Sequence, residues 1–442
     1  SSNKKYIIQK KMKNFLLSIL VLLFLITSLN AETFTTALSK AYKNNSELNA
    51  ERENINISEQ ELKISQGNYL PKITLSGSKS REDTKKLTNQ TGGNATIKDA
   101  DPLTKSISVE QTLIDFGRNA ELSKSKIGLD LAKAKLLKKE QDILYKATEA
   151  YSGLVLANEK LKINTDNVEL LSRQVETDQI RVERGQITLS DVSQSESSLA
   201  EAQAKLIQAE NELLTSKLNY ENIIGVLKDP KSLDQKSIKE YSLPQNLKSA
   251  IELSIKNNPN LIIAKLEYDQ AQKDKTIAKS DLAPSANLSL ERSYTDDLSA
   301  TYDEREKDTL KATVTWPFYS GGKNLASINK SSSLETRSRL ILDSVTKQNE
   351  TNVASAWSSY QSNKSLLNSV QAQVRAAEIA NEGISAEYNS GAGRTTLEVI
   401  QSNSLLLNAQ ISLADSERNF ILSQFNLLKS IGLLHSEHLK IK

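Results

Sequence analysis

The hydrophobic positions of this chain follow two different periods, and the shorter period predicts β-strands. In four short runs, apolar residues alternate with polar ones, as they do in a strand whose side chains point to opposite faces in turn. These runs contain Ile73 and Leu75, then Ile107 and Val109, then Leu288 and Leu290, and finally Leu310, Ala312, Val314 and Trp316. Each run therefore predicts a strand with one apolar face.

The longer period predicts very long helices. Between Arg118 and Gly185 there is no proline, and apolar residues recur every seventh position, at Leu122, Leu129, Leu136, Ile143 and Ala150. At 1.5 Å per residue this helix would be roughly 100 Å long. The returning helix alternates large residues (Val192, Leu199, Leu206, Leu213, Tyr220) with small ones (Ser195, Ala202, Ala209, Ser216), and the second half repeats this with Val399, Leu406, Leu413, Phe420, Leu427 and Ser402, Ala409, Ser416, Ser423. We call these lines the large/small seams, and they favour close helix packing.

The chain is an internal duplication. ALSKAYKNNSEL at 37–48 matches AIELSIKNNPNL at 250–261, and TLIDFGRN at 112–119 matches PFYSGGKN at 317–324. We expect a first repeat over 32–225, a linker over 226–246, and a second repeat with a short C-terminal tail over 247–442. The last matched pair marks a strand-to-helix corner in each repeat, with the candidate residues Gly117, Arg118, Trp316, Pro317, Gly321, Gly322 and Lys323. An ordinary duplicated β-turn is the alternative interpretation.

One segment differs in length between the repeats. Residues 81–105 and about 294–308 are polar and lie between the two alternating runs of their repeat. Segments of variable length are typical of surface loops. We therefore expect both segments to be surface loops, which would face the cell exterior if the strands beside them span a membrane.

The N-terminal residues predict export. Met12 is the only methionine, and a basic residue, an apolar run over 15–26 and small residues up to Ala31 follow it. This order is typical of a secretory signal peptide, with residues 1–11 as upstream sequence. An N-terminal membrane anchor is the alternative, although the apolar run is short for a transmembrane helix.

Composition and charge narrow the function classes. The chain has no cysteine and two histidines, which disfavours Cys- or His-based catalysis and Cys-rich metal sites. Residues 1–31 hold five lysines and no acid, so the mature chain has 52 basic and 54 acidic residues and a net charge of −2. Its basic character belongs to the export signal, and we expect no nucleic-acid partner. His435, Glu437 and His438 favour a solvated tail over a metal site, so we predict no catalytic residue, metal or cofactor.

Four strands limit how the chain can assemble. If these strands span a membrane, the sheet cannot leave an open edge in lipid, because each unpaired backbone group there costs several kcal/mol. Single-chain membrane barrels begin at about 8 strands, so four strands close only if several chains combine. An ordinary soluble coiled coil is the alternative, but it explains neither the signal peptide nor the strands.

Four stretches carry a resemblance to a known family: TLIDFGRN, PFYSGGKN, RGQITLSDV at 184–192, and AEYNSGAGRTTLEVIQSNSLLLNAQ at 386–410. With them, the chain from 32 to about 433 resembles the TolC family of outer-membrane efflux and secretion channels. The resemblance implies a mainly α fold, with a long helical coiled-coil barrel that extends through the periplasm of a Gram-negative bacterium. It also implies a small β part that trimerisation completes to a twelve-strand membrane barrel. A periplasmic adaptor and an inner-membrane transporter would be the partners.

The resemblance also assigns candidate gate residues near the two helix turns. It implies that Asp191 pairs with Arg394, that Tyr388 makes a further bond, and that both links hold the periplasmic entrance closed. An acidic ring at the constriction would contain Glu398, while Gln401 replaces its second acid. At the corners, Arg118 or Lys323 would lie at the lipid headgroups and Trp316 in the aromatic belt. The alternative is that the residues at the helix turns are routine turn and cap residues.

These observations favour a passive export duct, the exit of a tripartite efflux pump or a type I secretion system. A periplasmic coiled-coil adaptor or scaffold without a pore is the alternative. An enzyme is a third and weaker hypothesis, because no residue cluster in the sequence has a catalytic pattern.

Overall fold

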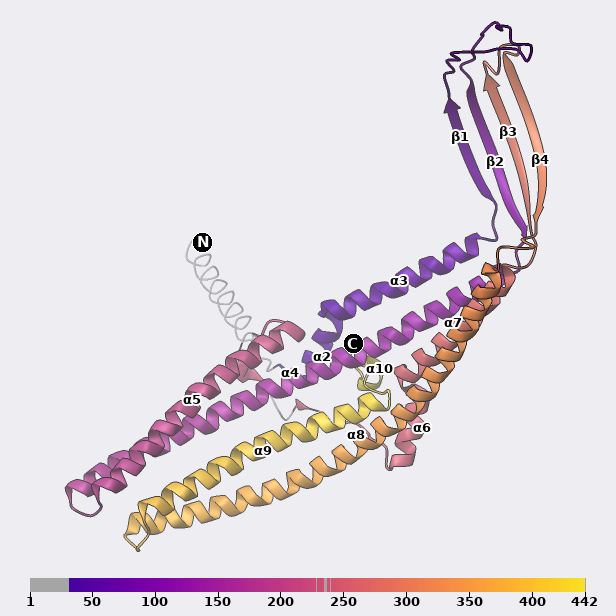
Figure 1. Ribbon diagram of the computed structural model, residues 1–442. Coiled ribbons are helices and arrows are strands. Elements are labelled where there is room, and N and C mark those ends of the chain that lie inside the picture. Colours follow the sequence, from indigo (N-terminus) through magenta and orange to yellow (C-terminus); the bar gives the residue numbers. More distant parts are fainter. Residues whose placement is uncertain (1–31, 228, 234–236, 239, 442) are drawn as a thin grey trace, which may run out of the picture. The chain divides into compact units, whose positions relative to one another are not determined.

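The computed structural model describes residues 32–227, 229–233, 237–238 and 240–441, and the predicted signal peptide lies outside this part. The elements follow in the order α2 (Phe34–Asn44), α3 (Ser46–Gly67), β1 (Lys72–Lys79), β2 (Leu103–Ile114), α4 (Arg118–Glu183), α5 (Leu189–Ile223), the 3-10 turn η1 (Pro230–Ser232), α6 (Leu247–Asn257), α7 (Pro259–Ser280), β3 (Ser285–Asp296), β4 (Glu304–Thr315), α8 (Lys323–Ser390), α9 (Thr396–Ser430) and α10 (Ser436–Leu439) (Figure 1). Two helices, two strands and a long helical hairpin thus occur twice. None of the helices in the described ranges carries an apolar stretch long enough for a membrane span.

The chain forms two compact units, and each unit draws on both halves of the sequence. Unit 1 combines the residues up to Asn49 with Lys139–Asn258 and Glu350–Lys442, while unit 2 combines Ala50–Lys138 with Pro259–Asn349. The sheet belongs to unit 2, and the turns of both long hairpins belong to unit 1.

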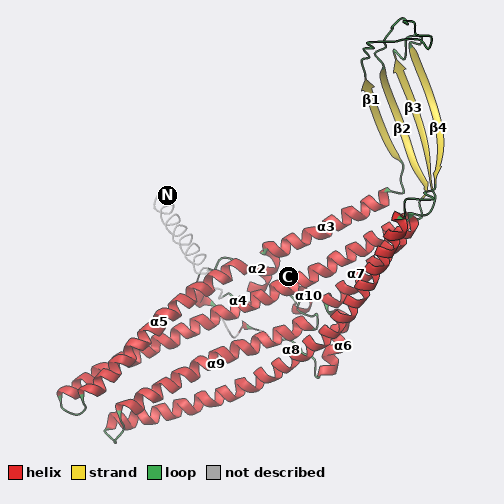
Figure 2. Ribbon diagram, in the orientation of Figure 1, coloured by secondary structure: helices red, strands yellow, loops and turns green. Residues whose placement is uncertain are grey.

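The four strands of unit 2 form one antiparallel sheet in the order β1-β2-β3-β4 (Figure 2). The register places Ile73, Val109, Leu290 and Leu310 in one row across the sheet. The four alternating runs therefore supply one common apolar face, as the sequence predicts. Leu310 is 71% and Leu75 is 78% exposed in the single chain, so this face has no cover from the chain itself.

The predicted loop over about 294–308 is wrong in its bounds. β3 continues to Asp296 and β4 begins at Glu304, so the connection contains only residues 297–303. These strand ends are polar yet paired: Arg292 Nε and Nη2 donate to the two carboxylate oxygens of Asp308 at 2.8 and 2.9 Å. Cross-strand pairs of opposite charge stabilise a sheet, and a polar composition therefore does not require a loop. In the first repeat the connection contains residues 80–102, close to the prediction.

The glycines of the two corners act in different ways. In the second corner, which follows Pro317, Gly321 and Gly322 have φ angles of 66° and 78°, a left-handed conformation that glycine adopts at little cost. α8 then begins at Lys323. In the first corner, a Cβ atom on Gly117 would come within 2.4 Å of the Ser280 hydroxyl oxygen on α7. Gly117 thus leaves room for the Ser280 side chain, and a larger residue there would force that side chain to move.

Arg118 and Trp316 both have contacts within their corners. The Arg118 guanidinium donates to the carbonyl oxygen of Thr112 at 3.0 Å and lies 4.3 Å from the ring centroid of Tyr69. The Trp316 indole N–H donates to the carbonyl oxygen of Leu282 at 3.1 Å, while most of its side chain stays exposed. These contacts fix the strand-to-helix geometry; the level of both residues in a membrane stays a prediction.

The large/small seams of unit 1 bring α5 and α9 together. The small residues of the seams that are fully buried are Ser195, Ala202, Ala209, Ser402, Ala409, Ser416 and Ser423. Leu199, Leu206 and Leu213 of α5 are only half-buried. Small side chains let two helix backbones approach closely, so the seams determine which helices become neighbours.

The C-terminal tail is packed, which corrects the expected solvated tail. Leu439 and Ile441 are buried, and the Ser436 amide donates to a carboxylate oxygen of Glu140 at 2.5 Å. His435 caps α10, because its Nδ1 atom accepts a hydrogen bond from the His438 amide. Among the described residues, no group of His, Cys, Asp or Glu side chains is arranged to hold a metal ion.

Candidate functional site

The turns α4–α5 and α8–α9 lie at the same end of unit 1 (Figure 1), and the helices that follow them begin with the same cap. The Asp191 amide donates to the Thr188 hydroxyl oxygen at 3.2 Å, and the Thr188 amide donates back to the Asp191 carboxylate at 2.9 Å. Thr395 and Glu398 form the same reciprocal pair at 3.2 and 2.8 Å. A capping box of this kind satisfies amide groups that have no partner within the helix.

The helices that precede the turns end differently in the two repeats. α4 is followed by Gly185 at φ 68°, and two residues separate this glycine from Thr188. α8 is followed by Gly391 at φ 77°, and three residues separate this glycine from Thr395. Both turns nevertheless have the same length, 184–188 and 391–395, and only the position of the left-handed glycine within them differs.

Arg394 lies in the second turn and pairs within its own hairpin. Its Nε atom lies 2.5 Å from a Glu387 carboxylate oxygen, and its Nη1 atom lies 3.0 Å from one of Glu398. The predicted pair with Asp191 is therefore wrong for the two hairpins of one chain. The physical reason is that each partner is engaged nearby, Asp191 by its capping box and Arg394 by two acids. A pair between hairpins of neighbouring subunits stays a prediction.

Both cap carboxylates are held in the charged form. The Thr188 backbone N–H lowers the pKa of Asp191 below its usual range. The Thr395 backbone N–H, and after it the Arg394 guanidinium, lowers the pKa of Glu398 in the same way. Both acids are thus ionised at neutral pH, and both are partly accessible to solvent.

A buried carboxylate joins the two hairpins a short distance from the turns. Asp178 on α4 is fully buried and accepts hydrogen bonds from Ser195 of α5 at 2.6 Å and from the Tyr388 hydroxyl of α8 at 2.8 Å. Gln174, one turn earlier on α4, donates to both oxygens of the same carboxylate at 3.0 Å. A buried charge with several donors is satisfied, whereas one without them would be very costly.

Tyr388 extends this arrangement to the fourth helix. Its hydroxyl lies 3.1 Å from the hydroxyl oxygen of Thr396 at the start of α9, and the guanidinium of Arg181 lies 4.4 Å from its ring centroid. Burial raises the pKa of the Tyr388 hydroxyl, so the group stays protonated and able to donate. We call Asp178, Ser195, Tyr388 and Thr396 the buried tip network, because together they connect α4, α5, α8 and α9.

Gln401 does not belong to this network. It is exposed on α9, while the next residue, Ser402, is buried and lies 3.0 Å from the side-chain oxygen of Asn381 on α8. That Gln401 and Glu398 line a constriction stays a prediction about the assembled protein.

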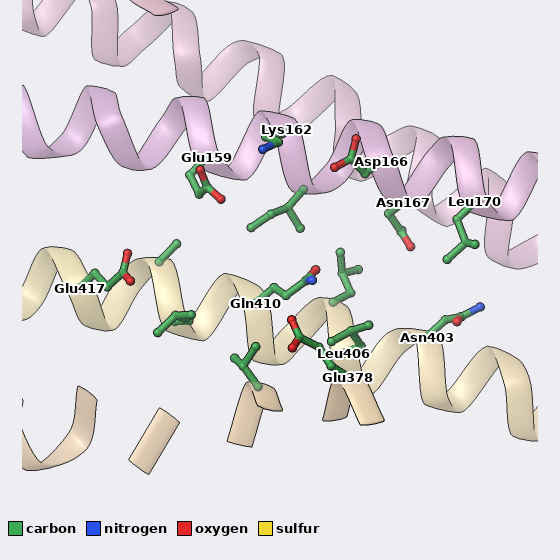
Figure 3. Close-up of a pocket in the computed structure, with 15 residues that line it drawn as sticks. Glu159, Lys162, Asp166, Asn167, Leu170, Glu378, Asn403, Leu406, Gln410 and Glu417 are labelled. Carbon is green, nitrogen blue, oxygen red and sulfur yellow. The ribbon is translucent and has the colours of Figure 1, made fainter. Parts of the chain in front are cut away.

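A groove of about 480 Å³ lies between α4 and the α8–α9 pair (Figure 3). Glu159, Lys162 and Asp166 border it from α4, and Glu378 and Glu417 border it from the other side. Its apolar lining includes Ile163, Leu170, Val374, Leu406, Leu407 and Leu413. The groove is thus lined by a mixture of apolar and polar side chains and is mostly acidic along its borders.

Comparisons with known proteins show the family of the chain. The family model of outer membrane efflux proteins matches residues 37–226 and 250–433. The chain belongs to the outer membrane efflux protein family. The outer membrane efflux protein BepC of Brucella suis biovar 1 (strain 1330) is 26% identical over 414 residues, which cover 93% of this chain and 88% of BepC. The proteases secretion protein PrtF of Dickeya chrysanthemi is 22% identical over 90% of this chain and 87% of its own length.

The solved structures show the fold. The Campylobacter jejuni CmeC outer membrane channel superposes with a TM-score of 0.80 at 14% identity, over 92% of this chain and 88% of that one. The efflux-protein family consists of outer-membrane channel proteins, which confirms the predicted fold class, localisation and channel function. The adaptor without a pore is therefore not retained as an alternative.

Three residues of the buried tip network are absent from the gate residues predicted from the sequence: Asp178, Ser195 as its partner, and Thr396. A signal for Asp178 was present: the seven-residue repeat that contains Ala150 continues through Ala157, Asn164 and Leu171 to Asp178. A carboxylate at a buried heptad position needs partners, and this alone identifies it as a candidate.

Proposed function

We propose that the chain forms a homotrimeric duct through the outer membrane, the exit of a tripartite efflux pump or a type I secretion system. The observation that carries this proposal is the open four-stranded sheet, which has one apolar face, one polar face and two edges, β1 and β4. The duct conducts its cargo passively, and we assign it no catalytic step.

Closure of the sheet supports the trimer. β1 and β4 run in opposite directions, so β4 of one subunit can pair with β1 of the next in the antiparallel manner of the existing ladders. Three subunits of four strands each then close a barrel of twelve strands, within the size range of bacterial outer-membrane barrels. Pairing removes both edges from lipid, where each unsatisfied backbone group costs several kcal/mol.

The partners we propose are a periplasmic adaptor and an inner-membrane transporter. BepC is named as an efflux protein and PrtF as a protein of protease secretion, so relatives of similar length serve both kinds of export. The groove between α4 and the α8–α9 pair supports docking of an adaptor helix with leucines on one face and basic residues beside them.

At the periplasmic tip we propose a gate. Glu398, followed one turn later by Gln401, lines the narrowest part of the tunnel, and Asp191 pairs with Arg394 of a neighbouring subunit when Arg394 exchanges one of its two acids. The buried tip network keeps the two hairpins of each subunit together. Three copies of each link then bias a two-state entrance towards its closed form.

The experiment that tests the duct combines mass and membrane insertion. Protein purified in detergent should have about three times the mass of one mature chain, which is the 48.9 kDa chain less its signal peptide. Val314→Asp, on the apolar face, should abolish insertion, whereas Thr313→Asp, its neighbour on the polar face, should be tolerated. A monodisperse monomer with full β content would exclude the barrel.

A further inference from the structure

The polar face of the sheet has an uneven charge distribution that the channel function does not require. On β4 the acids Glu304, Glu306 and Asp308 occupy even positions, and the bases Arg305, Lys307 and Lys311 occupy odd positions. Because side chains of a strand alternate, all three acids lie on one face and all three bases on the other.

The register identifies these faces. The even positions of β4 share their face with the apolar row of Ile73, Val109, Leu290 and Leu310, which fits lipid. The odd positions share their face with serine and threonine, as in the row of Ser76, Ser106, Ser293 and Lys307. This second face fits the water-filled interior of the barrel, so the three bases of β4 point into the channel.

The other strands do not cancel this charge. On the inner face, β1 adds Lys72, β2 adds Glu110, and β3 adds Glu291. Lys72 and Glu110 are directly opposite each other in the ladder, so their charges cancel. The remaining charges of the inner face are the three bases of β4 and the one acid Glu291. The inner face thus has a net charge of +2 per chain, and within the described residues none of its four bases lies in an ion pair.

We propose that the barrel interior is an anion-attracting exit, and that β4 selects for cargo with carboxylate, phosphate or sulfate groups. This inference rests on the proposed duct and adds a substrate class to it. Arg305 and Lys311 are six residues apart, so the bases extend over about 20 Å of one strand. Threefold repetition surrounds the pore with these stripes, and a pore wall of one sign concentrates ions of the opposite sign.

The absence of cysteine in the chain permits a direct test. Thr309 lies on the inner face between Lys307 and Lys311, so Thr309→Cys places one thiol among the bases. The trimer is reconstituted in vesicles and treated with an anionic (sulfonatoethyl) or a cationic (trimethylammonioethyl) methanethiosulfonate. The ratio of the two modification rates is compared with the same ratio for a small free thiol.

We expect the anionic reagent to be favoured by about threefold to tenfold at low salt. At 0.5 M salt the preference should largely disappear, because the screening length becomes shorter than the pore radius. Lys307→Gln with Lys311→Gln should remove the preference in low salt. Glu306→Gln is the matched control, since it removes a charge from the same strand on the lipid face and should leave the ratio unchanged.

Two results would overturn the proposal, and they differ in what else they affect. If Thr309→Cys reacts at the free-thiol ratio with or without the two lysines, the charge preference is wrong and the duct stands. If Leu310→Cys reacts with both charged reagents while Thr309→Cys is protected, the assignment of the two faces is reversed, and the barrel itself fails.

Discussion

The buried tip network and the ion pairs of Arg394 lie within the same end of unit 1 but differ in solvent access. Asp178 is fully buried and accepts hydrogen bonds from three side chains. Arg394 is exposed, and its bonds to Glu387 and Glu398 stay within one hairpin. The buried group therefore connects the two hairpins, whereas the exposed group only orders the turn that contains it.

The difference in solvent access determines which contact should contribute more to closure. Exposed ion pairs contribute little, because water screens them and their side chains lose freedom. A buried carboxylate that loses its donors, or donors that lose their carboxylate, costs far more than the bond itself contributes. We expect mutations in the buried tip network to exceed those at Arg394 in their effect on both stability and conductance.

The largest effect is expected from Asp178→Ala. This change leaves the hydroxyls of Ser195 and Tyr388 buried without their acceptor, at a cost of about 2–5 kcal/mol per subunit. Thermal unfolding should begin at lower temperature, and single-channel conductance should rise because the hairpins separate. Asp166→Ala is the control, since Asp166 is an exposed acid on the same helix and its loss should change neither quantity.

A smaller effect is expected from Tyr388→Phe. The ring keeps its packing and its contact with Arg181, while the bonds to Asp178 and Thr396 are lost. We expect about 1–2 kcal/mol of destabilisation per subunit and a conductance between those of the native protein and Asp178→Ala. Tyr360→Phe provides a comparison, because Tyr360 stacks on Phe420 through its ring. Equal effects of both tyrosine changes would mean that the hydroxyl of Tyr388 has no special role.

Arg394→Ser tests the exposed side of the comparison. We expect a modest rise in conductance at low ionic strength and none at high salt, where the native ion pairs are already screened. Glu398→Ala removes an acid at the periplasmic entrance, so it should weaken the local attraction for cations there, with less opening. If Arg394→Ser opened the channel more than Asp178→Ala, the order of importance proposed for the two regions would be wrong.

The smallest effect is expected from pH. Folding lowers the pKa of Glu398, so its ionised side chain stabilises the fold. This contribution to the free energy of unfolding is fully present above the ordinary pKa of 4.5 and is lost as the pH falls through the folded pKa. Asp191 behaves in the same way below 3.8. Thermal stability should therefore be constant from neutral pH down to about 4.5 and then decrease. Glu398→Gln should make this decrease shallower, and an unchanged slope would contradict the role of the cap.

Much of the fold follows from sequence patterns because those patterns record burial directly. The alternating runs around Ile73 and Leu310 predict strands, and the small residues at Ala202 and Ala409 predict close helix packing. The predicted bounds of the polar loop near 294–308 were wrong, because polar residues there belong to paired strands. Asp308, for example, pairs with Arg292 on the neighbouring strand, and composition does not reveal a cross-strand partner.

The site was predictable only in part. The caps formed by Asp191 and Glu398 are local, so the pattern of threonine followed three residues later by an acid indicates them. The contact of Asp178 with Tyr388 joins residues 210 positions apart. Such a contact depends on how two hairpins pack, and the sequence offers only the indirect sign of an acid at a heptad position.

The most direct test of the account is single-channel recording of the reconstituted trimer, native and Asp178→Ala, in planar bilayers of the same composition. We expect discrete channels of low conductance for the native protein and a severalfold higher conductance for the variant, with Asp166→Ala unchanged. Absence of discrete channels would contradict the duct. Equal conductance of a folded Asp178→Ala trimer and the native protein would contradict the closing role of the buried tip network.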